Sequence, residues 1–257
     1  MITLSATQVY GWLAGLFWPF VRIGSCFMVA PAFGASTVPV RIRIVLAGAV
    51  ALLVAPLVSI PAVTPLSAAG VAITVQQVII GVALGFSLQI LFEAVSMGGE
   101  VLANSMGLSL AFNLDPMNGA STPALGQLYT ILITLLFLVL GGHLALIRVL
   151  VDGFHTLPVG ANGLGPAGLW SLVAWGSQLF SGALAVSLPG VTALLIANLA
   201  FGVVSRAAPT LNIFSVGLPV ALVLGLIVLI AGLPTLETSF IRLLGATLAY
   251  LAHLSGA

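Results

Sequence analysis

The chain carries very little charge. Only six of its 257 residues are basic and five are acidic, 4% in all, whereas soluble domains carry roughly 25%. Because the net charge is +1 and the sequence has no basic run, nothing would attract a phosphate backbone, so nucleic-acid binding is excluded. There is no lysine. Every basic residue is an arginine, whose planar group suits buried contacts between helices.

Cysteine and catalytic motifs are almost as scarce. The single cysteine, Cys26, cannot form a disulfide within the chain and lies in an apolar stretch, where it packs as a small hydrophobe. The three histidines are scattered without the spacing of a metal site, and no glycine-rich phosphate loop occurs. The sequence therefore predicts a protein that is not an enzyme and that holds no cofactor and no metal.

Apolar sequence is what the chain has in abundance. Hydrophobic residues make up 61% of it. A bilayer core is crossed by about 20 residues, and windows of roughly this length lie at 9–30, 40–60, 70–92, 126–150, 176–204 and 213–233, with a shorter one at 240–254. We therefore expect an all-α, membrane-class protein of six to seven helices in a single domain.

Three of these windows are not ordinary membrane spans. Arg22 interrupts the first, Gln76 and Gln77 lie in the third, and Pro189-Gly190 should break the fifth. A charge near the centre of a bilayer costs about 2.5–3.5 kcal/mol on insertion scales. We therefore expect the helices with embedded charges to be surrounded by protein and not by lipid.

A polar stripe begins inside the third window and continues past its end. Glu93 and Glu100 are two helical turns apart, and Gln89 is one turn before Glu93, so the three share one helix face. One interpretation is a helix end that reaches the membrane interface near Glu100. The other is a face turned to a water-filled conduit or to an arginine of a partner. Gly98 and Gly99 should loosen the helix before the next connection.

The connection from Met106 to Pro123 fits neither a membrane span nor a solvated loop. It holds too many helix breakers to cross a bilayer, yet it is rich in methionine and bulky apolar side chains, which can seal a constriction against water and then deform. Its glycines and an Asp-Pro turn would act as hinges. A re-entrant loop at the interface without a gating role is the alternative. The candidate residues are Met106, Gly107, Leu108, Leu110, Phe112, Asn113, Asp115, Pro116 and Met117.

A third candidate group lies at helix junctions. Arg206 and Pro209 mark the end of one helix, and Asn212 suits the N-cap of the next. We interpret these residues, together with arginines near the start of the chain, as contacts at helix junctions or with partner subunits. The full group is Arg22, Arg41, Arg43, Arg206, Pro209, Asn212, Phe214 and Gly217.

Four stretches together resemble one known family. They are VRIGSCFMVAPAFGASTVPVRIRIVLA, GGEVLANSMGLSLAFNLDP, LFLVLGGHLALIRVLVDGFHTLPVG and VVSRAAPTLNIFSVGLPVALVLG. The likeness runs in order over most of the chain, from about residue 12 to 233. On these residues the chain is similar to the FliR family of flagellar and type III secretion export-gate proteins.

The resemblance implies a single subunit of a helical hetero-oligomeric gate, with a FliP-like part over about 1–205 followed by a FliQ-like helical hairpin over about 206–257. It implies FliP-like and FliQ-like partners and an FlhB-like subunit, in the flagellar basal body at the bacterial inner membrane. Unfolded flagellar subunits would pass through the channel, and the Met106–Pro123 loop would plug it. The overall likeness favours a flagellar over a virulence-associated system. Two other classes stay open, a subunit of a solute transporter or permease and a passive scaffold for assembly.

Overall fold

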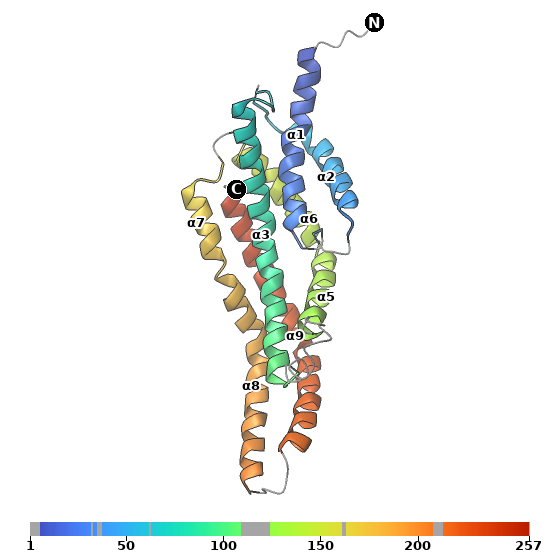
Figure 1. Cartoon of the computed structure of the whole chain (residues 1–257), viewed down its shortest axis with the longest axis vertical. Coiled ribbons are helices and arrows are strands. Elements are labelled where there is room, and N and C mark those ends of the chain that lie inside the picture. Colours follow the sequence, from blue (N-terminus) through green and yellow to red (C-terminus); the bar gives the residue numbers. More distant parts are fainter. Residues whose placement is uncertain are drawn as a thin grey trace. The chain divides into compact units, whose positions relative to one another are not determined.

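The computed structural model describes residues 6–31, 33–34, 38–61, 63–108, 124–160, 163–207 and 213–256. Over these ranges the secondary structure is helical and contains no strand, which confirms the all-α class. The elements in chain order are α1 (Ala6–Val29), α2 (Val40–Val54), the 3-10 helix η1 (Ala55–Leu57), α3 (Ala68–Ser105), α5 (Ala124–Val139), α6 (Gly142–Thr156), α7 (Pro166–Trp175), α8 (Gln178–Ala207) and α9 (Ile213–Ser255) (Figure 1).

Among the residues that the structure describes, four helical stretches are long and apolar enough to cross a membrane: α2 with η1, α3, α7 with α8, and α9 from Pro219 onward. Together, α5 and α6 add a fifth if they are counted as one broken span. With 38 residues in α3 and 43 in α9, these helices are about 57 and 65 Å long, well beyond the ~30 Å of a bilayer core. Both helices therefore extend outside any bilayer that they cross.

The C-terminal part of the chain differs from the sequence prediction. The windows at 213–233 and 240–254 form one helix, α9, without a turn between them. A hairpin that includes α9 therefore needs α8 as its other arm, and α8 begins well before residue 206. The division into a FliP-like and a FliQ-like part itself stays a prediction.

Two expected features of the other windows are also wrong. The window at 126–150 is two helices, because Gly141 adopts a positive φ of 71° that ends α5 ahead of α6. The break expected at Pro189-Gly190 is absent, and α8 runs straight through it. A proline inside a helix removes one hydrogen bond and crowds the carbonyl four residues before it, which can kink a helix without ending it. Gly190 has a packing role instead, since a Cβ added there would be 2.8 Å from Leu102 Cδ1 of α3.

The helices form two compact units. One consists of Met1–Ile90, Leu138–Gly176 and Gly245–Ala257, and the other of Leu91–Phe137 and Ser177–Leu244. Because the boundaries fall inside α3 and α9, each of these two long helices contributes to both units.

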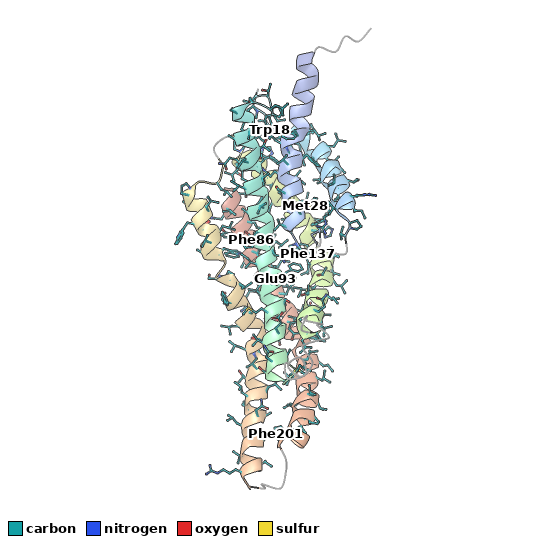
Figure 2. All side chains as sticks on the ribbon, in the orientation of Figure 1. Trp18, Met28, Phe86, Glu93, Phe137 and Phe201 are labelled. Atoms are coloured by element: carbon teal, nitrogen blue, oxygen red, sulfur yellow. The ribbon has the colours of Figure 1, made fainter. Side chains whose placement is uncertain are left out.

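In the first unit, α1 crosses α3 at close range, and Figure 1 shows the two helices side by side there. Small residues make this possible: a Cβ added at Gly85 would be 2.7 Å from Cys26 O, and Gly81 has no room for one either. Trp18, buried and labelled in Figure 2, donates its indole N–H to Thr74 Oγ1 at 3.2 Å. Glycines on α3 therefore allow the two backbones to approach.

In the second unit, α3 packs against two helices through adjacent glycines. A Cβ added at Gly98 would be 3.1 Å from Ala183 O of α8, and one at Gly99 would be 2.9 Å from Leu125 O of α5. Both glycines are buried and helical. The expectation that they loosen α3 is therefore wrong, because backbone atoms of α8 and α5 occupy the space where their side chains would be.

Aromatic rings join α3, α5 and α9 in the same unit. The ring of Phe92 meets the rings of Phe137 and Phe240 edge-on, with centroids 5.5 and 6.2 Å apart. Phe137 is fully buried and is labelled in Figure 2. Consistent with this, 67% of the most apolar window of α3 is buried inside the chain, against 17% for α2 and α9. The helix that carries Gln77 and the polar stripe is thus the most buried of the four candidate spans.

Candidate functional site

The candidate loop begins at a well-defined helix end. Leu108 donates its backbone N–H to Ala103 O at 3.1 Å, and Gly107 donates its own to Asn104 O at 3.1 Å. Together with the positive φ of 80° at Gly107, these two bonds form a Schellman motif, which satisfies the last carbonyls of a helix. Gly107, expected as a hinge, therefore adopts the conformation of a helix cap.

Met106 belongs to this helix end. Its backbone N–H donates to Leu102 O at 3.0 Å, and its side chain is only 1% exposed. The side chain lies against Gly225 of α9, where an added Cβ would be 2.7 Å from Met106 Sδ and still closer to Cγ and Cε. Leu108 is half-buried. The other candidate loop residues lie outside the described residues: Leu110, Phe112, Asn113, Asp115, Pro116 and Met117.

The polar stripe lies along α3. Glu100 is half-buried at the contact with α5, where a Cβ added at Gly126 would be 2.9 Å from Glu100 Cγ and 3.2 Å from Oε1. Gln89 is half-buried, and Glu93, labelled in Figure 2, is exposed on the surface of the chain. Glu100 thus lies between helices, and Glu93 is the member of the stripe that faces outward.

We expect Glu93 to face protein or water and not lipid, because a carboxylate in the hydrocarbon is costly. A Glu93→Cys variant in a Cys26→Ala background should react with a water-soluble maleimide, or with no maleimide if a partner covers it. A photoactivated hydrophobic reagent that partitions into the lipid acyl chains should not label this position. Strong labelling from the lipid phase of intact membranes would reverse the assignment of this face.

Arg22 lies at the centre of a polar cluster in the first unit. It is 1% exposed and donates from Nε to Gln77 Oε1 at 2.7 Å, and from its two terminal nitrogens to Gly153 O at 3.1 Å and Leu157 O at 2.8 Å. Its guanidinium carbon lies 4.1 Å from the ring centroid of Phe154. Both carbonyls belong to the C-terminal end of α6, where the helix dipole favours a cation. Arg22 therefore joins α1, α3 and α6 inside the chain and is not on a surface that a partner could reach.

The other arginines of the group lie at helix ends. At the start of α2, Arg43 donates from Nε and Nη2 to Val38 O at 3.1 and 2.9 Å, and Arg41 is exposed. Arg206 is exposed in the last turn of α8, where its charge suits the helix dipole. Of the rest, Phe214 and Gly217 lie in α9, and Pro209 and Asn212 lie outside the described residues.

Three residues, Gln77, Gly190 and Gly225, make contacts that the sequence analysis did not predict. Gln77 could have been found, because it is a polar residue in an apolar window. Gly190 and Gly225 could not, because a glycine in an apolar helix gives no sign of which side chain fills its place. In the part of the chain that the structure describes, no cluster of three or more histidine, cysteine, aspartate or glutamate residues could hold a metal ion.

Known proteins match nearly the whole chain. Residues 13–247 match the family of bacterial export proteins, family 1. Flagellar biosynthetic protein FliR of Pectobacterium carotovorum subsp. carotovorum is 38% identical over 229 residues, which covers 89% of this chain and 88% of that protein. Flagellar biosynthetic protein FliR of Escherichia coli (strain K12) is 39% identical over 236 residues, which covers 91% and 90%. The chain belongs to the FliR family of bacterial export proteins, and it is a membrane-embedded component of the flagellar export apparatus.

Proposed function

We propose that this chain is a core subunit of the flagellar type III protein export gate and that it lines and plugs the channel through which unfolded flagellar subunits pass. The observation that carries the proposal is the match to bacterial export proteins over residues 13–247. This match includes both ends of the candidate loop and the helices that hold them.

The two faces of α8 support a place inside a larger assembly. Toward α3 it presents small residues, Gly182, Ala183 and Gly190. The opposite face presents large, exposed apolar side chains: Leu184, Leu188, Leu195, Leu199 and Val203. From Leu184 to Val203 this face is about 29 Å long, close to the ~30 Å of a bilayer core, so it needs lipid or a partner subunit to cover it.

FliP-like and FliQ-like subunits are the partners that would cover these faces, with an FlhB-like subunit around the cytoplasmic entrance. The assembly would stand in the flagellar basal body at the bacterial inner membrane. In this proposal the residues up to about 205 correspond to a FliP-like part. The FliQ-like hairpin needs α8 as well as α9, so the two parts overlap in α8.

The plug is the segment from Met106 to Met117. Its side chains include leucine, phenylalanine and methionine, which deny hydrogen-bond partners to water and so keep a constriction dry. Methionine is flexible enough to repack when a chain passes. The capped end of α3 at Gly107 gives this segment a defined starting point.

Partner dependence tests the subunit role. Produced alone, the tagged chain should aggregate or be degraded, because its apolar faces stay uncovered outside the bilayer. Produced with the FliP-like and FliQ-like proteins of the same organism, it should purify as one complex, and native mass measurement should count one copy of it. A chain that purifies alone as a stable monomer or homo-oligomer would contradict the gate and favour a transporter.

A further inference from the structure

The last turn of α3 packs against two glycines on neighbouring helices. Leu102 fills the place of a side chain at Gly190 of α8, and one turn later Met106 fills the place of a side chain at Gly225 of α9. All four residues belong to the second unit. We call the space left by the absent side chain of Gly225 the notch. It is the tighter of the two contacts, since three atoms of Met106 would lie within 2.7 Å of a Cβ added at Gly225.

Met106 is buried although it lies at a helix end. It immediately precedes the αL glycine of the Schellman motif and is 1% exposed. Within the described residues no hydrogen bond reaches its thioether, so dispersion and shape keep it in the notch. Such a contact can open and close without leaving a buried polar group unpaired.

We propose that Met106 and Gly225 form a latch that holds the start of the plug segment against α9 in the closed gate, and that Met106 must leave the notch before a substrate can pass. The inference rests on the proposed plug function. Gly225 is a positioning residue in this role, because any side chain there would occupy the space that Met106 needs.

A reversible crosslink tests the latch in the complete gate. Met106→Cys and Gly225→Cys are combined in a Cys26→Ala background and produced with all partner subunits. The closeness of Met106 Cγ to the added Cβ places the two sulfurs within reach of a disulfide. Under oxidant, export of flagellar subunits should be lost, and dithiothreitol should restore it. Each single cysteine variant should export equally with and without oxidant.

Two outcomes overturn the latch. One is a disulfide that forms fully while export continues, which would show that Met106 stays in the notch when substrates pass. The other is a double variant that exports when reduced yet forms no disulfide, which would show that Met106 does not lie at Gly225. Export by the reduced form is the control for folding. The plug itself is tested separately by ion leak, so a leaking loop variant together with an ineffective crosslink would refute the latch alone.

Discussion

Replacing Leu110 and Phe112 with serine is expected to make the gate leak ions while export continues at least in part. Serine offers hydrogen bonds to water at the point where the proposed plug keeps the channel dry, so the barrier is lost and the channel stays. Deleting part of the stretch from Gly107 to Gly119 should act in the same direction. The measurement is membrane conductance, or entry of a small solute, in cells that overproduce the complete gate.

The matched control for this change is Leu66→Ser. Leu66 is 98% exposed between α2 and α3, so the same substitution there should leave conductance at the parental level. Within the loop, Met117→Leu should stay tight, because leucine preserves apolar volume, and Met117→Asp should leak because it admits water. A loop variant that stays as tight as the parent at equal expression would remove the plug from the proposal and favour a passive scaffold.

The second large effect is expected at Arg22. An Arg22→Ala change leaves Gln77 Oε1 and the Leu157 carbonyl without the donor that they now share, whereas Gly153 O still accepts the Leu157 N–H. Each buried acceptor left unpaired costs about 1–3 kcal/mol, so the loss should be about 2 kcal/mol or more. We expect a lower midpoint of thermal unfolding for the purified complex in detergent, and much less complex in the membrane.

Two variants separate the hydrogen bonds of Arg22 from its charge. Arg148→Ala removes an exposed arginine from α6, the same helix that Arg22 caps, and should leave the unfolding midpoint almost unchanged. Arg22→Lys keeps the cation but cannot reach three acceptors at once, so its midpoint should lie between those of alanine and the parent. An Arg22→Ala complex as stable as the parent would show that the cluster contributes little.

The sequence predicts a property of the chain when that property is local, and it does not when the property depends on which residues are neighbours in space. Hydropathy and charge are properties of composition, so the all-α membrane class followed from them directly. Arg22 in an apolar window predicted a helix surrounded by protein, since a lone charge in lipid is too costly. The sequence could not say that its acceptors are the last carbonyls of α6, because those residues lie about 130 positions further along the chain.

The roles of the glycines could not be predicted from the sequence. Sequence alone allows a glycine to be a hinge, a cap or a place of close packing, because all three exploit the missing side chain. Gly98 and Gly99 were expected to loosen α3, and the neighbouring backbones of α8 and α5 make them packing sites. Gly107 is a cap because its φ is positive. Composition and the hydropathy pattern by themselves determined the fold class, and four sequence stretches pointed to the FliR family. Only the tertiary structure decided what each glycine does and buried Met106 against Gly225, because the role of a missing side chain is set by the atoms that take its place.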